Sequence, residues 1–186
     1  TKLFNKAMEA DKDCGGLLAY NYLSGEHITG MESGRPLFVR TANSNFNLAN
    51  FMRTQIMSSL SVVKTGMDIL FKEEQAKVDK IYGHGGLFKT KGVGQSILAA
   101  AMDAPVYVME TAGEGGAWGI ALLASYLVNK QGDEKLPEFL NRAVFAGAEG
   151  EKVDPCPDAV KGFEEYIERY SKGLAIERAA IDNLAE

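Results

Sequence analysis

Ile-Tyr-Gly-His-Gly-Gly-Leu-Phe-Lys-Thr-Lys-Gly-Val-Gly, residues 81–94, is the stretch that decides how this chain is interpreted. A short apolar run leads into one group of glycines, and a second group precedes a helical pattern: Gly83, Gly85, Gly86, Gly92 and Gly94. Glycine has no Cβ, so a ligand can approach the bare backbone at such a corner. The N–H groups at the start of the following helix favour anions. Many α/β proteins use glycines at such corners without binding anything, so a structural and a ligand-binding role both remain open.

The apolar pattern on both sides of this corner alternates between strand and helix. It predicts strands at 17–23, 37–40, 78–82 and 106–109, and helices at 3–10, 47–72, 94–102, 114–128, 137–144 and 158–184. Residues 145–157, rich in Gly, Pro and charge, are predicted to be a connector. The order strand, helix, strand, helix with short connections favours parallel pairing and an α/β domain.

Two of the predicted helices are long enough to form the core. In 47–72, Asn45 and Asn47 are N-cap candidates. Its apolar side chains recur at steps of three and four: Leu48, Met52, Ile56, Leu60, Val63, Met67 and Leu70. In 158–184 the predicted apolar face consists of Val160, Phe163, Ile167, Tyr170 and Leu174. The rest of that helix is mostly acidic, and we expect it to face solvent.

Composition excludes several classes of protein. The chain has 186 residues, 46% hydrophobic and 24% charged, which is ordinary for a globular domain. A net charge of −5 without a basic run argues against nucleic-acid binding. No apolar run approaches the roughly 20 residues that cross a bilayer, so no membrane association is expected. Two cysteines far apart, Cys14 and Cys156, suggest a reducing, cytoplasmic location.

A second glycine cluster follows the next predicted strand. Residues 112–119, Ala-Gly-Glu-Gly-Gly-Ala-Trp-Gly, open the helix predicted at 114–128. The carboxyl ends of adjacent parallel strands form the ligand crevice of an α/β sheet, so the two glycine clusters could share one pocket. The alternative is that Gly116 and Gly119 only allow the helix to pack closely on the sheet. Both roles remain open.

No catalytic or metal-binding group emerges from the residues alone. His27 and His84 stand singly in glycine-bearing loops, and the cysteines have no partner at ligand spacing. His84 lies within the glycine corner, although a simple turn histidine is the favoured interpretation. Lys89 and Lys91 lie in the same corner and could contact a phosphate group, but the favoured interpretation is that both are solvent-exposed loop lysines. The chain has neither a Walker A pattern nor a Gly-x-Ser-x-Gly elbow.

Several short motifs, taken in order, resemble the C-terminal half of an FGGY carbohydrate kinase. They are residues 13–26 (Asp-Cys-Gly-Gly-Leu-Leu-Ala-Tyr-Asn-Tyr-Leu-Ser-Gly-Glu), 85–87 with 95–99, 103–108 (Asp-Ala-Pro-Val-Tyr-Val) and 117–124 (Ala-Trp-Gly-Ile-Ala-Leu-Leu-Ala). Each motif is short, and the match lies in their order and spacing, which cover nearly the whole chain. The ribulokinase and xylulokinase branches look closest.

The resemblance implies the actin-like ATPase fold, built from ribonuclease-H-like domains with a central mixed sheet flanked by helices. Residues 1–186 would be the C-terminal nucleotide-binding domain of a two-domain sugar kinase. The full enzyme would transfer the γ-phosphoryl group of ATP, with Mg²⁺, to a small sugar, a pentulose such as xylulose or ribulose. The adenosine motif falls on Gly85 and Gly86 with the adjoining Leu87, with Thr90 as the polar residue where relatives often carry Asn. Gly116 matches a later small-residue motif.

The departures from the family are as informative as the match. The N-terminal domain, with its Asp-x-Gly phosphate loop and catalytic Asp base, has no counterpart in these residues. No catalytic residue is therefore assigned, and the chain by itself is expected to be inactive. The resemblance is compatible with a homodimer. The alternative is a non-catalytic actin-like protein that binds nucleotide or a partner as a regulator.

Overall fold

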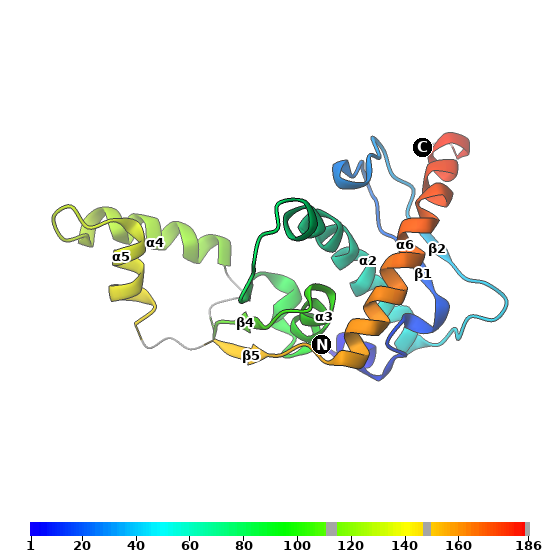
Figure 1. The fold of residues 1–186 in the computed structure, drawn as a ribbon, viewed down its shortest axis with the longest axis horizontal. Helices are drawn as coiled ribbons and strands as arrows, with labels where there is room; N and C mark the ends of the chain where they lie inside the picture. Colours follow the sequence, from blue (N-terminus) through cyan, green and yellow to red (C-terminus); the bar gives the residue numbers. More distant parts are fainter. Residues whose placement is uncertain (111–114, 147–149, 185–186) are drawn as a thin grey trace.

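The computed structural model describes residues 1–110, 115–146 and 150–184. In chain order its elements are α1 (Lys2–Lys6), η1 (Ala7–Glu9), η2 (Cys14–Gly16), β1 (Leu18–Tyr20), η3 (His27–Thr29), β2 (Leu37–Val39), α2 (Leu48–Asp68), η4 (Ile69–Glu73), β3 (Ile81–Gly83), η5 (Gly86–Lys89), α3 (Val93–Met102), β4 (Val106–Val108), α4 (Gly115–Asn129), α5 (Leu136–Phe139), η7 (Leu140–Val144), β5 (Glu151–Val153) and α6 (Pro157–Asn183). We call residues 115–146 the arm and the remaining described residues the body. Figure 1 shows the arm extending from the sheet on the side away from α6.

The sheet at the glycine corner is small and mixed. Its order is β3-β4-β5, with β3 parallel to β4 and β4 antiparallel to β5. A separate antiparallel pair joins β1 to β2. The predicted parallel pairing is therefore confirmed, and the fold is the expected mixed α/β arrangement. The strand β5 was not expected, because 145–157 was predicted as a connector. Its sequence, Glu-Lys-Val, carries two charges and has no strand pattern of its own. It forms a strand because it pairs with the free edge of β4.

The body is built around three helices. α3 is almost wholly buried and packs against both α2 and α6. Asn47 caps α2 as predicted, accepting the Asn50 backbone N–H at 2.9 Å. A side-chain oxygen at this position satisfies one of the donors that every helix start leaves unpaired.

The apolar stripe predicted for α2 is only partly right. Ile56 and Leu60 are buried, but Leu48, Val63 and Leu70 are 53%, 47% and 44% exposed. The buried face instead includes polar side chains: Asn50, Arg53, Thr54, Ser58 and Ser61. The hydroxyl groups of this buried face are satisfied because they donate hydrogen bonds to backbone carbonyl oxygens. Ser58, for example, donates to the Ala19 carbonyl oxygen at 2.7 Å and so joins α2 to β1.

The prediction for α6 also needs a correction. Phe163 and Tyr170 are buried as expected, but Tyr166, which was left off the predicted face, is fully buried too. Glu177, expected to face solvent with the acidic residues, is fully buried as well. It accepts the backbone N–H of Arg35 at 2.6 Å and so holds the loop before β2 against α6.

Three tyrosines join α6 to β1 and the segment after it. The Tyr20 hydroxyl donates to the Tyr170 carbonyl oxygen at 2.5 Å, and the Tyr22 and Tyr170 hydroxyls are 2.5 Å apart. Two glycines allow α6 to approach the N-terminal part of the chain closely. A Cβ on Gly173 would lie 2.5 Å from the Tyr20 hydroxyl oxygen, and one on Gly162 would lie 2.4 Å from the Cβ of Lys12. The strand predicted at 17–23 is shorter in the structure, where β1 covers Leu18–Tyr20, and Leu23 is 89% exposed.

Candidate functional site

The glycine corner lies where β3 and β4 end. Their register pairs Gly83 with Val108, so the residues that follow the two strands leave the sheet side by side. β3 continues through His84 into η5, and Gly92, in the left-handed conformation with φ +77°, begins α3. This is the strand-to-helix corner that the sequence predicted, at the carboxyl ends of parallel strands, where α/β sheets bind ligands.

Some glycines of the corner have structural roles. A Cβ on Gly83 would lie 2.4 Å from the Phe88 ring, and one on Gly94 would lie 2.6 Å from Leu87 Cγ. The side chains of Phe88 and Leu87 therefore fold back over β3 and the start of α3. Leu87 belongs to the partly buried apolar side chains around the core. Of the residues predicted to bind nucleotide, Leu87 thus has its side chain packed inward.

Gly85 and Gly86 differ from these glycines because they face open space. A Cβ on either would have no atom within 4 Å among the neighbours considered. Gly85 has φ +101°, a conformation that side-chain-bearing residues rarely adopt. Thr90 follows η5 directly, and its carbonyl oxygen accepts the Val93 N–H at 3.3 Å. Lys91 pairs with Glu151 of β5 at 3.0 Å. Gly92 is open in the same way, so the open backbone of the corner consists of Gly85, Gly86 and Gly92.

The structure brings the two glycine clusters together through His84. A Cβ on Gly115, the first residue of α4, would lie 3.0 Å from His84 Cβ and 3.3 Å from His84 Nδ1. Residues 112–114 of the second cluster lie outside the described residues. Gly116 is exposed, and neither it nor Gly119 has an atom within 4 Å of an added Cβ. The close helix-on-sheet packing considered for these two glycines is therefore not found.

Two hollows meet at Tyr82 and His84. One, of about 400 Å³, is lined by Tyr82, His84, Met109, Asn141 and Phe145. The other, of about 420 Å³, is mainly apolar and includes Gly86, Leu87 and Phe88. Sequence reasoning missed most of the first set. Met109 follows its strand directly and could have been found from that position. Asn141 and Phe145 reach the corner only because the arm folds back.

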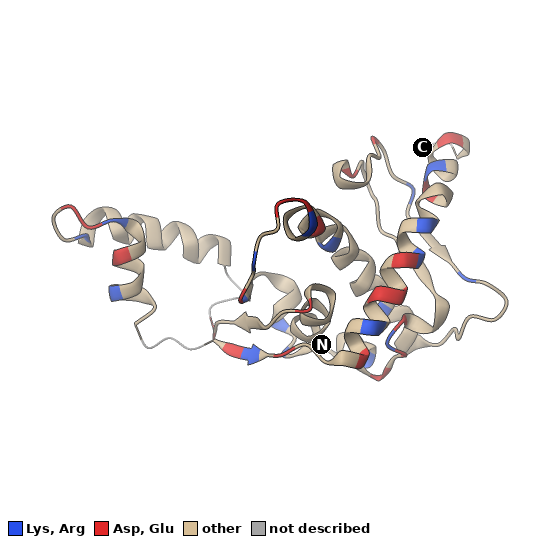
Figure 2. Ribbon diagram, in the orientation of Figure 1, with Lys and Arg blue, Asp and Glu red and all other residues tan. Residues whose placement is uncertain are grey.

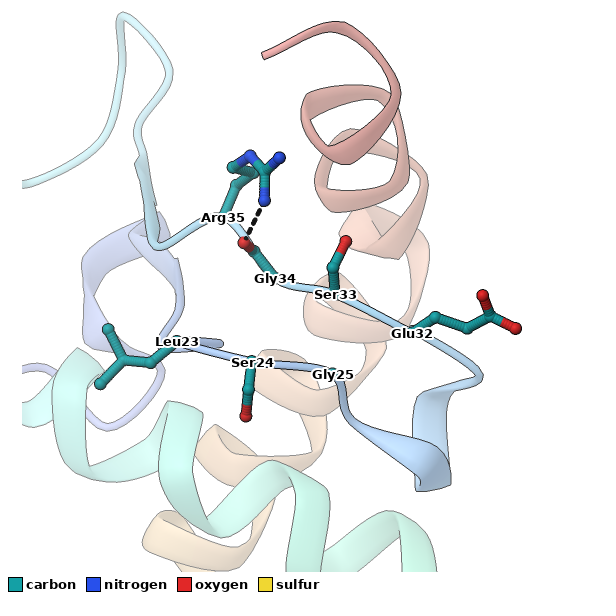
Figure 3. Close-up of a pocket in the computed structure, with 7 residues that line it drawn as sticks. All are labelled: Leu23, Ser24, Gly25, Glu32, Ser33, Gly34 and Arg35. Carbon is teal, nitrogen blue, oxygen red and sulfur yellow. Dashed lines mark hydrogen bonds between the residues drawn. The ribbon is translucent and has the colours of Figure 1, made fainter. Parts of the chain in front are cut away.

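A hollow of about 550 Å³ lies elsewhere, in the loop between β1 and β2 (Figure 3). Two glycines, Gly25 and Gly34, allow the outgoing and returning segments of this loop to pass close to each other. A Cβ on Gly34 would lie 2.3 Å from the Tyr22 carbonyl oxygen. The Arg35 guanidinium donates to the Gly34 carbonyl oxygen at 2.8 Å and to that of Leu184 at 2.9 Å. The other labelled side chains point in different directions (Figure 3). The residues around this hollow therefore form a loop that Arg35 ties to the end of α6, and their side chains do not converge on a ligand.

Among the residues that the structure describes, no group of three or more His, Cys, Asp or Glu side chains could hold a metal ion. None of the described helices combines the length and the apolar character needed to cross a membrane.

Residues 1–128 match the C-terminal domain of the FGGY family of carbohydrate kinases. This is more than half of the chain, and the chain belongs to that family. Its resemblance to the family, found in short motifs, is thus confirmed over the corner and both glycine clusters. Family membership favours a sugar kinase over the non-catalytic alternative.

Individual relatives are longer than this chain. A xylulose kinase of Haemophilus influenzae is 25% identical over 169 residues, which are 91% of this chain and 33% of the relative. The ligand-bound xylulose kinase of Lactobacillus acidophilus shares the fold with a TM-score of 0.71 and 19% identity, over 97% of this chain and 34% of that one. Plasmodium falciparum glycerol kinase with ADP has a TM-score of 0.62 and 13% identity, over 100% of this chain and 34% of that one. The chain thus spans about a third of their length.

Proposed function

We propose that this chain is the ATP-binding C-terminal domain of a carbohydrate kinase that transfers the γ-phosphoryl group of ATP to a hydroxyl group of a pentulose such as xylulose or ribulose. The observation that carries the proposal is the open glycine backbone at the ends of two parallel strands, within a chain of the FGGY family. Xylulose kinases among its relatives support the choice of a pentulose.

In this proposal each predicted residue has a limited role. Gly85 and Gly86 leave room for the nucleoside and present backbone N–H and carbonyl groups to it. Leu87 holds this backbone in place by packing against Gly94. Thr90 supplies a hydroxyl group near the start of α3. Gly116 keeps the first turn of α4 open, where backbone N–H groups favour the negative charge of phosphates.

The chemical step would need groups beyond these residues. Phosphoryl transfer requires a base that orients the attacking hydroxyl group and accepts its proton. None of the carboxylates in this chain matches that base. We therefore expect residues 1–186 alone to bind ATP without phosphorylating a sugar. Rapid phosphorylation of xylulose or ribulose by this chain alone would show that the base lies within it.

The nucleotide site can be tested by calorimetric titration of ATP into Gly86→Arg and Gly86→Leu variants. Either side chain enters the space that Gly86 leaves open, so we expect ATP affinity to fall about tenfold or more, equivalent to about 1.4 kcal/mol. The Leu variant separates the effect of size from that of charge. Leu23→Arg, which adds the same charge at an exposed position outside the corner, is the matched control. Unchanged affinity in both Gly86 variants would remove the corner from the site.

Three further features are part of the same proposal. Mg²⁺ would accompany ATP by bridging its phosphate groups. The protein would work in the cytoplasm, in keeping with its two unbridged cysteines, Cys14 and Cys156. It would form a homodimer, which sedimentation of the complete protein would test. A monomer at micromolar concentration would contradict this last point.

A further inference from the structure

The hollow of about 400 Å³ at the glycine corner lies between the body and the arm. Its lining comes from β3 and the residue after it, from the residue after β4, and from η7 of the arm with the residue that follows it. These residues are Tyr82, His84, Met109, Asn141 and Phe145. Tyr82 and His84 also line the neighbouring hollow that includes Gly86. A nucleoside held at the open backbone of Gly86 therefore has this hollow beside it.

The hollow has uncharged walls. None of its five described lining residues is an Asp, Glu, Lys or Arg. Arg142, next to Asn141 in sequence, is engaged by Glu134 at 2.7 Å. α4 carries no charge, and the charged residues of the arm lie in the turn after α4 and along the helix beyond it (Figure 2). Such walls suit a flat, neutral group better than phosphate groups, so the part of a nucleotide that fits here is the base.

Two of the walls are aromatic rings that other side chains hold in position. The Phe145 ring contacts the Trp118 ring of α4, with centroids 5.9 Å apart. The Tyr82 ring is 5.7 Å from the Tyr107 ring of β4, and the Lys80 ammonium group lies 5.6 Å from its centroid. Tyr82 is nevertheless 49% exposed. Because bases bind proteins by stacking on aromatic rings, these two walls can hold the faces of a base.

Asn141 supplies the hydrogen-bonding groups that the edge of a base needs. Its side chain is exposed and makes no hydrogen bond with the part of the chain that the structure describes. It lies in η7, a π-helical segment of a kind that is rare and recurs at functional sites. The other polar residue of the lining, His84, stands beside Gly115 at the start of α4, where the proposed function has the phosphate groups.

An amide side chain matches adenine better than guanine. It carries one acceptor oxygen and one donor nitrogen side by side. Adenine presents the complementary pair, an amino group beside a ring nitrogen, and Asn binds this pair with two hydrogen bonds in known complexes. Guanine has an oxygen in place of that amino group, so an Asn oxygen would meet a second acceptor there.

We propose that Asn141 determines which nucleotide this kinase uses. Its amide oxygen accepts a hydrogen bond from the amino group of adenine, its amide nitrogen donates to the adjacent ring nitrogen, and the rings of Tyr82 and Phe145 pack against the base. This inference rests on the proposed function, because it needs the nucleotide to lie at Gly86. Asn141 lies beyond residues 1–128, which match the family model, so the family match does not supply this role.

Calorimetric titration of the complete protein, without sugar, tests the inference with three nucleotides. They are ATP, GTP and purine riboside triphosphate, which is ATP without the amino group. We expect the parent to bind ATP about tenfold or more tightly than either of the others. Asn141→Ala should lose about tenfold in ATP affinity and bind ATP and purine riboside triphosphate equally. A purely structural role would weaken all three nucleotides by one factor and keep the preference for ATP, which would overturn the proposal.

Two further variants make the test specific. Asn141→Asp is close to Asn in size and keeps an oxygen acceptor for the amino group. We expect it to retain the preference for ATP over purine riboside triphosphate that Asn141→Ala loses. Asn129→Ala, at another exposed Asn of the arm, is the matched control and should bind all three nucleotides as the parent does. A parent that binds all three equally, or an Asn141→Asp variant without the preference, would contradict the inference.

The two proposals can fail separately. If Gly86→Leu weakens the binding of all three nucleotides but Asn141→Ala keeps the preference of the parent, the nucleotide site stands and the role of Asn141 is wrong. If Gly86→Leu and Gly86→Arg leave ATP affinity unchanged, the glycine corner itself is not the site, whatever the Asn141 variants do.

Discussion

The body and the arm bury their side chains very differently. In the body, α2, α3 and α6 meet over a continuous core that includes Phe163, Tyr166 and Tyr170. Among the described residues of the arm, Phe139 is the one side chain that is buried, at 2% exposed. The arm is nevertheless well closed on itself, since Arg142 pairs with Glu134 at 2.7 Å and Tyr126 donates to the Glu134 carbonyl oxygen at 2.8 Å. The comparison shows that the apolar side chains of the body are buried against other elements of this chain, whereas α4 packs against the chain on one side only.

Truncating one buried ring in each region should show whether the two unfold together. Phe163→Ala removes a ring from the body core, and such changes cost about 3–5 kcal/mol. We expect its urea midpoint, followed by circular dichroism, to fall sharply. Phe139→Ala should change the fluorescence of Trp118, the single tryptophan, which lies in the arm, with little effect on that midpoint. Equal loss of the midpoint in both variants would mean that arm and body are one cooperative unit.

Adding a methyl group to a helical glycine should have opposite signs in the two regions. Gly162→Ala places a Cβ 2.5 Å from the backbone carbon of Lys12, so we expect a loss of about 1–3 kcal/mol from overpacking. Gly119→Ala in α4 meets open space, and the better helix propensity of Ala should add up to about 1 kcal/mol. Thermal unfolding of both variants measures this. A stabilising Gly162→Ala would show that α6 can move away from Lys12.

The smallest expected effect concerns Glu177 and depends on pH. Burial raises the pKa of its carboxyl group above the usual value, so folding disfavours the ionised form. The stability that the protonated group allows is complete below the unfolded pKa and is lost as pH rises through the folded pKa. Glu177→Gln should therefore be more stable than the parent at neutral pH and equal to it in acid.

The matched control for this titration is Glu168→Gln. Lys172 lowers the pKa of the exposed Glu168 carboxyl group, so the sign of its pH dependence is reversed. Thermal midpoints of both variants across a pH series provide the measurement. Identical pH profiles for the parent and Glu177→Gln would show that Glu177 does not titrate differently in the folded state.

The features that neighbouring residues determine could be predicted from the sequence. Asn47 caps α2 because its side chain reaches an N–H group three residues on. The glycine corner was predictable for the same reason, since β3, η5 and α3 follow one another within 81–102. Parallel pairing of β3 and β4 followed from the alternation of strand and helix. The roles of Gly85, Gly86, Thr90 and Gly116 in binding nucleotide remain predictions.

Features that depend on distant residues could not be predicted in this way. Glu177 looks like a surface acid, and its partner is a backbone N–H that is 142 residues away. The strand β5 has a charged sequence and forms only against β4. At the corner, Asn141 and Phe145 reach Tyr82 and His84 through the folding of the arm, which no local pattern indicates.

The place of α6 in the chain has a consequence for biosynthesis. Its Gly162 packs on Lys12 and its Gly173 on Tyr20, so the helix that completes the core follows every other element of the body in sequence. Contacts between such distant residues are slow to form. While the ribosome is still adding residues 157–183, Tyr20 of β1 and the face of α3 that packs against α6 stay exposed to water. Nascent chains should therefore depend on chaperones until α6 has left the ribosomal tunnel.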